Sequence, residues 1–240
     1  FELIHPEDIQ FVIDSVTNTK TNLVPLHCTY RYYHPKKGLV WHEVNSLPVV
    51  EAEGTVICHG IATDITEGIS SKQKIVKANR LYQFISQMNQ MIVRSTDEDT
   101  IFKEACSIAV NVGKFKMVWI GVKEEISDKV VPRVIAGEDN GYVEMIQSTL
   151  LDNQETIISS RCEAIKKDPY IVINDISEDH LMTWKEEALK RGYQSLMILP
   201  IRKFDETVGI FCFYASEKNF FDAEEIALVV EATLDVSFAL

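Results

Sequence analysis

The chain has 240 residues, of which 46% are hydrophobic and 25% are charged, so it can bury a core in one large domain or two smaller ones. Its formal net charge of −12 argues against binding to nucleic acids or anionic membranes, because those partners require clusters of lysine and arginine. No apolar run approaches the roughly 20 residues of a membrane-spanning helix, and the first residues lack the features of a signal peptide.

The first quarter of the chain predicts a short helix followed by strands. Residues 5–18 begin with a polar turn and continue with apolar residues at helical spacing. Strand-like runs follow at 26–34, 39–50 and 55–65, joined by "PKKG" and "EAEG", two short polar loops that end in glycine. We expect a three-stranded antiparallel meander. Such a sheet is barely stable alone, so another element should cover or extend it.

A long helix is predicted at residues 66–95. Its apolar residues alternate steps of three and four, the spacing of a coiled-coil seam, for about two heptads. The helix can pack on a domain core or on a second copy of the chain, and the two interpretations are compatible at different ends. The seam residues are Ala78, Leu81, Ile85, Met88 and Ile92.

The remainder of the chain mixes helices and strands. The predicted helices are 96–114, with a threonine cap, 142–150, 182–192 and 222–240, capped by Asp222. The predicted strands are 115–124, 129–137, 170–176, 193–203 and 206–216, the last two forming a hairpin across "FD". Residues 151–169 are ambiguous between a short helix and a loop. This order indicates an antiparallel sheet with helices packed on it, an α+β fold.

Several stretches near the start resemble the C-terminal part of a PAS domain. They are "HPED" at 5–8, "YRY" at 30–32, Gly38 with Trp41, Pro48, Gly54 and "GIATDITE" at 60–67. The resemblance covers the last helix and three strands of that domain, and the segments before them are absent. In that family a signalling helix leaves the sheet directly after the D-I-T motif.

Residues 80–240 resemble a nearly complete GAF domain. The matching stretches are "VINDI" and "YQSLMILPIRKFDETVGIFCFYASEKNFFDAEEIALV", with a strand ending in Leu-Pro, a Val-Gly strand and F-x-x-E before the last helix. Together the resemblances imply a partial PAS domain at 1–66, a connector helix at 67–95 and a GAF domain at 96–240. A rigid helix between two sensor modules can relay rotation or sliding.

The chain carries none of the common catalytic motifs, such as a Walker loop, G-x-S-x-G, H-E-x-x-H or G-x-G-x-x-G. The resemblances therefore imply a non-catalytic regulatory fragment of a cytoplasmic, homodimeric signalling protein. Its parent is expected to be a sensor histidine kinase, or otherwise a diguanylate cyclase. Rival hypotheses are a purely structural dimerisation module and, because a few GAF-fold proteins reduce methionine sulfoxide with cysteines, an enzyme.

A small ligand, which the sequence does not identify, is expected between the GAF-like sheet and residues 140–190. Asn174 and Asp175 are polar groups beside a buried strand and could orient such a ligand. The alternative is that Asp175 caps the following turn and that Trp184 is part of the core. The candidate wall residues are Trp119, Tyr170, Ile173, Asn174, Asp175, Trp184, Ser195 and Met197.

No metal site is expected from the histidines and cysteines of the first strands, because His27 and Cys28 point to opposite faces, as do Cys58 and His59. The odd count of five cysteines and the absence of a Cys-x-x-Cys pair argue against a disulfide framework. Cys106 and Cys212 lie among apolar neighbours and are expected to be buried thiols.

Two known ligands of GAF domains were weighed. Cys162 lies in a suitable region for a bilin but lacks the neighbouring motifs of bilin-binding proteins. "EKNFFDAEE" partly matches the pattern of cyclic-nucleotide binders, as general GAF sequences also do. The cations available for a phosphate are Lys166, Lys167 and Arg202.

Overall fold

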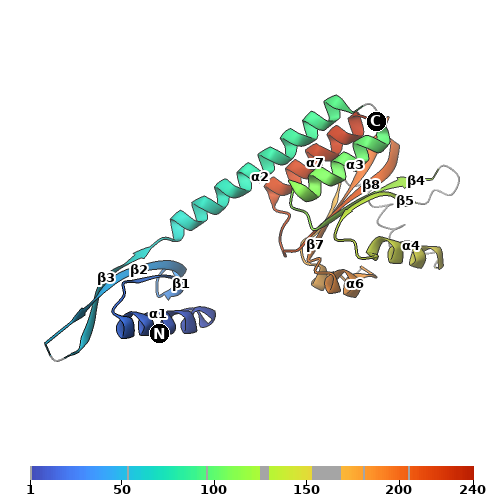
Figure 1. The fold of residues 1–240 in the computed structure, drawn as a ribbon. Helices are drawn as coiled ribbons and strands as arrows, with labels where there is room; N and C mark the ends of the chain where they lie inside the picture. The colour runs from blue at the N-terminus through green and yellow to red at the C-terminus, as the bar shows by residue number, and fades with distance from the viewer. Residues whose placement is uncertain are drawn as a thin grey trace. The chain divides into compact units, whose positions relative to one another are not determined.

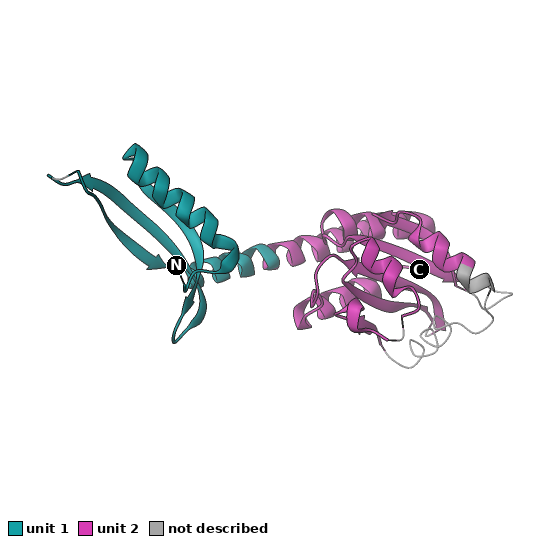
Figure 2. Cartoon of the chain, turned by 90° about the horizontal axis from the view of Figure 1, so that it is seen from below, with its two compact units in different colours: residues 1–77 teal, residues 78–240 magenta. Residues whose placement is uncertain are grey.

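The chain forms two compact units, Phe1–Lys77 and Ala78–Leu240, which Figure 2 shows in different colours. The boundary between them lies inside helix α2, Thr66–Arg94. The domain boundaries expected after residues 66 and 95 stay predictions. The computed structural model describes residues 2–52, 54–95, 97–124, 130–152, 169–180, 182–204 and 206–240.

The first unit contains the predicted helix and meander. Its elements are the 3₁₀ turn η1, Pro6–Asp8, helix α1, Ile9–Asn22, and strands β1, Leu26–His34, β2, Gly38–Val50, and β3, Val56–Asp64. The strands pair antiparallel in the order β1-β2-β3. The expected strands therefore form within one residue of their predicted ends.

Helix α1 and strand β1 are held together by a small core and one ion pair. Val12 of α1 and Leu26 and Cys28 of β1 are among the buried residues. The Asp8 carboxylate accepts hydrogen bonds from the backbone N–H of Arg31 at 2.8 Å and from its guanidinium at 2.7 and 3.0 Å. The "HPED" turn thus fixes the start of α1 against β1.

The end of β3 is joined to α2 by the side chains of the D-I-T motif. Asp64 accepts a hydrogen bond from the backbone N–H of Thr66 at 3.1 Å and another from Lys37 Nζ at 2.7 Å. The hydroxyl of Thr66 accepts from the backbone N–H of Trp41 on β2 at 2.8 Å. These bonds hold the first turn of α2 on the sheet, which accounts for the abrupt change from strand to helix.

The second unit is a five-stranded antiparallel sheet in the order β5-β4-β8-β7-β6. Its strands are β4, Met117–Lys123, β5, Val130–Gly137, β6, Ile171–Ile173, β7, Ser195–Lys203, and β8, Glu206–Ala215. Its other elements are α3, Glu98–Asn111, α4, Tyr142–Asp152, the 3₁₀ turn η2, Ile176–Glu178, α6, Lys185–Lys190, and α7, Ala223–Phe238, with the C-terminal half of α2.

Helices cover both faces of this sheet. Figure 1 shows α2, α3 and α7 on one face and α4 and α6 on the other. Strand β7 supplies both cores, because Met197 and Leu199 pack under α2, α3 and α7 while Leu196 and Ile198 pack under α4 and α6. The expected α+β fold is confirmed.

The cap residue predicted for α7 is confirmed, whereas α3 is capped by a different residue from the one predicted. Asp222 caps α7 by accepting from the backbone N–H groups of Glu224 and Glu225, both at 3.1 Å. Helix α3 is capped by Asp97, which accepts from the backbone N–H of Thr100 at 3.0 Å, rather than by the predicted threonine. Carboxylates suit this position because they also face the positive end of the helix dipole. Most of the ambiguous range 151–169 lies outside the described residues.

No helix in the described part of the chain combines the length and apolar character needed to cross a membrane.

Candidate functional site

The apolar residues predicted to line one pocket lie on two faces of the five-stranded sheet. Trp119, Ile173 and Trp184 pack in the core under α4 and α6. Tyr170 and Met197 pack in the opposite core, under α2, α3 and α7. Successive side chains of a strand alternate between faces, and the sequence does not say which face a helix covers. Tyr170 and Met197 therefore lie across the sheet from the other three.

Three tyrosines that sequence reasoning did not select complete the core under α4 and α6. The rings of Tyr142, Tyr193 and Tyr214 contact one another, with centroids 5.0 to 5.6 Å apart. The guanidinium of Arg191 lies 5.5 Å from the Tyr142 ring centroid, a cation–π distance. The sequence pattern that could have identified Tyr214 is the alternation of side chains between the two faces of β8, which places Tyr214 on the same face as Cys212.

The polar atoms buried in this aromatic core include the indole nitrogens Nε1 of Trp119 and Trp184 and the hydroxyl of Tyr142. The hydroxyl of Tyr214 lies within side-chain hydrogen-bonding reach of both Tyr142 and Trp119, which leaves the indole of Trp184 without a partner in the described structure. A buried unpaired donor costs about 1–3 kcal/mol. A molecule offering acceptor atoms here would recover part of that free energy.

The tyrosine hydroxyls of this core stay protonated at neutral pH. Burial is the main cause that raises the pKa of Tyr142, Tyr193 and Tyr214 above the usual tyrosine value. Each hydroxyl is therefore a donor as well as an acceptor. The indoles of Trp119 and Trp184 can only donate. The core therefore presents hydrogen-bond donors from both residue types and acceptors from the tyrosines alone.

The polar candidates Asn174, Asp175 and Ser195 hold one loop of the protein. This loop, residues 216–222, connects β8 to α7 and is called the β8–α7 loop below. The side chain of Asn174 donates to the backbone oxygen of Phe221 at 2.9 Å and accepts from its N–H at 3.0 Å. The hydroxyl of Ser195 donates to the backbone oxygen of Glu217 at 2.8 Å.

Asp175 has the capping role that the sequence offered as the alternative. It caps η2 by accepting from the backbone N–H of Ser177 at 2.9 Å, and it accepts from Lys218 Nζ at 2.8 Å. The hydrogen bonds from Lys218 and then Ser177 are the main causes that lower the pKa of Asp175. Lys218 Nζ also donates to the Ser177 hydroxyl at 2.9 Å. The carboxylate, hydroxyl and ammonium of this cluster are bonded to one another and to the backbone of η2, which is a capping arrangement.

The predicted seam of α2 divides between the core and the surface. Met88 is fully buried in the core of its own chain, so it is not available to a second copy. Ala78 is exposed, and Leu81, Ile85 and Ile92 are half-buried. The most exposed large apolar side chains on this part of α2 are Tyr82 and Val93, at 72% and 86%. The outward stripe thus runs beside the predicted seam rather than along it.

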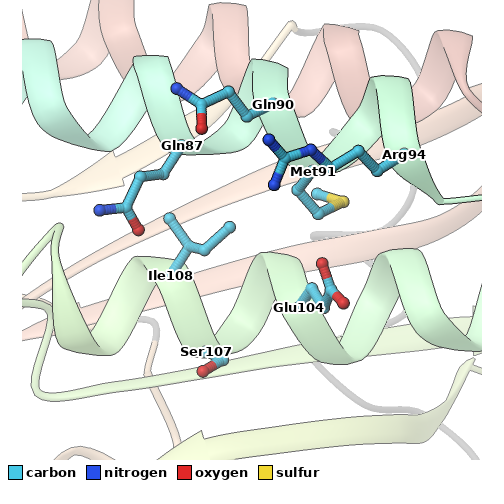
Figure 3. Close-up of a pocket in the computed structure, with 7 residues that line it drawn as sticks. All are labelled: Gln87, Gln90, Met91, Arg94, Glu104, Ser107 and Ile108. Carbon is cyan, nitrogen blue, oxygen red and sulfur yellow. The ribbon is translucent and has the colours of Figure 1, made fainter.

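An open groove of about 410 Å³ lies between α2 and α3. Arg94 of α2 and Glu104 of α3 lie on its two sides, and Met91 and Ile108 form its apolar part (Figure 3). The remaining lining residues are Gln87, Gln90 and Ser107. The side chains of this groove are mostly exposed and belong to two adjacent helices, whereas the unpaired indole of Trp184 is on the other face of the sheet.

A buried ion pair connects α2 to α7. Arg80 pairs with Glu225, and their side chains are 18% and 2% exposed. Arg80 also donates to the backbone oxygen of Gly113 at 2.7 Å and lies 5.2 Å from the Phe220 ring centroid. Burial lowers the pKa of Arg80, and the carboxylates of Asp222 and Glu217 oppose this effect. Sequence reasoning missed this pair.

The sequence pattern could have identified both members of this ion pair, because each lies on the apolar face of its helix. Arg80 precedes the buried Phe84 by four residues, and Glu225 precedes the buried Val229 by four residues. Residues four apart share one face of a helix. Each charge therefore lies on the apolar stripe of its own helix, where a lone charge without a partner would be strongly destabilising.

The described thiols are mostly inaccessible. Cys28, Cys106 and Cys212 are buried, and Cys58 is partly exposed. Burial raises the pKa of Cys106 to about 12, which disfavours the reactive thiolate. Cys162, the residue considered for a bilin, lies outside the described residues.

No metal site is found in the described part of the chain, where no group of three or more His, Cys, Asp or Glu side chains has suitable geometry. His27, on β1, is paired with Asn45 at 2.7 Å. Of the cations considered for a phosphate, Lys166 and Lys167 lie outside the described residues. The Nε of Arg202 is buried without a hydrogen-bond partner in the described structure.

A family model described as "GAF domain" matches residues 95–240, more than half of the chain. The chain belongs to the GAF domain family. This match agrees with the five-stranded sheet and its two helical layers. The search of curated proteins found no match.

Solved structures share this GAF fold at low sequence identity. A free methionine-R-sulfoxide reductase from Neisseria meningitidis, in complex with its substrate, is 12% identical with a TM-score of 0.52, covering 68% of this chain and 89% of that one. The GAF domain of a phosphoenolpyruvate-protein phosphotransferase from Coxiella burnetii is 13% identical with a TM-score of 0.50, covering 67% and 92%. At these identities the likeness shows the fold alone.

Proposed function

We propose that this chain is a non-catalytic sensory module of a cytoplasmic signal-transduction protein. Its GAF domain would receive a small molecule or a protein partner and pass the change to α2. The single observation that carries the proposal is that one helix, α2, begins on the D-I-T junction of the first unit and contributes Phe84, Met88 and Met91 to the GAF core. A helix shared in this way is suited to carry a rotation or shift between modules.

The first unit is proposed to be the C-terminal part of a PAS domain. The three antiparallel strands, the preceding α1 and the hydrogen bonds of Asp64 and Thr66 support this assignment. The parent protein is proposed to be a sensor histidine kinase, with a diguanylate cyclase as the alternative. In either case the catalytic domain would belong to another part of the parent.

A homodimer is proposed to form through the exposed stripes of α2 and α7. Tyr82 and Val93 of α2 and Leu234 and Phe238 of α7 expose between 59% and 93% of their surface. Large exposed apolar side chains clustered on a surface are typical of interaction sites. Helices α2 and α7 lie on the same face of the GAF sheet (Figure 1). A second copy is the partner that would cover both stripes at once by two-fold symmetry.

The ligand site is proposed to be the aromatic core under α4 and α6. The unpaired indole donor of Trp184 and the aromatic rings around it support a small apolar or aromatic molecule with acceptor oxygens. Native mass spectrometry of the purified chain, compared with its denatured mass, tests this directly. A dimer carrying an extra mass that disappears on denaturation supports a sensor. A dimer of bare chain mass that stays bare after incubation with a cell extract would favour a purely structural dimerisation module.

An enzymatic role as a methionine sulfoxide reductase is the competing proposal, suggested by the name of one solved structure with the same fold. Such chemistry needs accessible thiolates, and Cys106 and Cys212 are buried on either side of the sheet. Titration of the folded protein with a thiol reagent separates the two proposals. A fast-reacting thiol in the GAF domain would favour the reductase, and slow labelling of every GAF-domain cysteine would favour the sensor.

A further inference from the structure

The β8–α7 loop is held on both of its sides by groups from different layers of the GAF domain. On one side are the sheet residues Asn174, at the end of β6, and Ser195, at the start of β7, which bond its backbone at 2.8 to 3.0 Å. On the other side is Arg80 of α2, which lies over the ring of Phe220 and pairs with Glu225 just beyond the loop.

The sheet side of the loop is connected to the aromatic core. Asn174 directly follows Ile173, and Asp175 directly precedes Ile176, and both isoleucines pack in the core under α4 and α6. The loop returns a second bond to this segment, because the backbone N–H of Asn219 donates to the backbone oxygen of Asn174 at 2.8 Å. A shift of β6 by a molecule in the aromatic core would therefore move the loop.

The helix side of the loop has a second connection to α2 through aromatic rings. Phe84, one turn beyond Arg80, contacts Phe115 with centroids 6.0 Å apart. Phe115 in turn contacts Phe220 at 5.5 Å and Phe221 at 6.1 Å. The loop is thus attached to α2 by the contact of Arg80 with the Phe220 ring and by ring packing at Phe84. The ion pair of Arg80 with Glu225 holds the start of α7 to the same helix.

We infer that the β8–α7 loop is the element that couples the aromatic core to α2, with Asn174 and Arg80 as its two positioning residues. This inference rests on the proposed sensory function and specifies its regulation. Arg80 marks where α2 joins the GAF core, since residues 70–76 of the helix are exposed and Phe84 is buried. Moving α2 would require breaking a buried ion pair, which favours two discrete positions over gradual motion.

Hydrogen–deuterium exchange of the whole unliganded chain tests this coupling. Asn174→Ala should increase exchange at residues 81–84 of α2, although Asn174 does not touch that helix. By reciprocity Arg80→Met should increase exchange at Ile171–Ile173 of β6. Each substitution is expected to raise the exchange rate of its distant reporter segment by roughly five- to a hundredfold. In the Arg80→Met background, Asn174→Ala should add no further change in α2.

Matched variants keep the test interpretable. Arg133→Met removes another arginine from an ion pair, the exposed one with Asp99, and should leave both reporter segments unchanged. Where Arg80→Met does not fold, the double variant Arg80→Met with Glu225→Gln removes the pair without leaving a buried charge. Asn174→Asp is the second variant at the sheet side, because it keeps the acceptor for the Phe221 N–H while its other carboxylate oxygen replaces the donor and repels the Phe221 carbonyl oxygen.

The coupling would be refuted if Asn174→Ala altered exchange only in β6 and the β8–α7 loop, or altered α2 equally with and without Arg80. Either result would make the loop contacts structural alone. Because no ligand or dimer is needed for this measurement, such a result would leave the proposed sensory function to be decided separately by mass spectrometry.

Discussion

At the scale of single residues, charged side chains in this protein are placed by their partners. Asp8 is held by three hydrogen bonds from Arg31, and this pairing lowers the pKa of Asp8 to about 2. Glu7 contacts the same guanidinium at 2.8 Å but its side chain is 73% exposed. Asp8 and Glu7 contact the same arginine, so their contributions to stability can be compared between a multiply hydrogen-bonded carboxylate and an exposed one.

Asp8→Asn is expected to destabilise the first unit by about 2 kcal/mol at neutral pH, because it removes charge-assisted bonds to Arg31. The folded-state pKa of Asp8 is depressed, so its stabilisation is present above about pH 4 and is lost as the pH falls toward 2. Native-state hydrogen exchange of the β1 amides across pH 7 to 3 measures it. Glu7→Gln is the control and should cost less than about 1 kcal/mol. Equal losses of stability for Asp8→Asn and Glu7→Gln would contradict the stronger role given to the Asp8 contact.

At the scale of elements, the GAF sheet depends on the close approach of two glycines. A side chain on Gly209 of β8 would meet the backbone oxygen of Gly121 on β4 at 2.4 Å. The strands are irregular here, with register shifts between Ile120 and Gly121 and between Ile201 and Arg202. The Val-Gly pattern read from the sequence is therefore explained by close packing of backbones rather than by a turn.

Gly209→Ala is expected to destabilise the protein by about 1–3 kcal/mol, because backbone atoms must move to admit the methyl group. Gly68→Ala is the matched control, since a side chain at Gly68 meets no atom within 4 Å and lies in a helix. There alanine should be neutral or stabilise by about 0.5–1 kcal/mol. Thermal unfolding followed by circular dichroism compares the two. A Gly209→Ala protein as stable as the parent would refute the close-approach argument.

At the scale of the whole molecule, the apolar residues left at the surface are the basis of the proposed dimer. Helix α7 buries Val229, Ala232 and Val236 and exposes Leu234 and Phe238. Helix α2 likewise has a buried face and exposes Tyr82 and Val93, about three turns apart, on the other side. Exposed large apolar side chains on two neighbouring helices are the surface that the proposed partner would cover.

Tyr82→Lys combined with Phe238→Lys is expected to weaken the proposed dimer at least about tenfold, because two charges would be buried in an apolar interface. Sedimentation equilibrium over a range of concentrations measures the change. Gln83→Lys combined with Gln87→Lys adds the same charge at exposed polar positions of α2 that lie further round the helix from Tyr82, and should leave the dimer intact. Met88 is unsuitable for this test because it is buried within its own chain. An unaltered dimer in the first variant would exclude the α2 and α7 surface.

The sequence by itself determined the elements, the α+β class and the GAF resemblance. Hydrophobic periodicity, short glycine loops and the Asp222 cap are local signals, and local backbone geometry responds to them directly. The same reasoning placed Asp175 at a cap as one of two alternatives. The structure also confirmed the expected contact of helices with the antiparallel sheet.

Only the tertiary structure decided which residues share a site. Side-chain alternation is visible in sequence, but the face that each helix covers is not, so Met197 and Trp119 were expected on one wall and lie on two. Asn174 and Ser195 were read as ligand contacts because a polar side chain near a core has no visible partner in sequence. Their partner is a loop more than 20 residues away along the chain, and only folding brings it there.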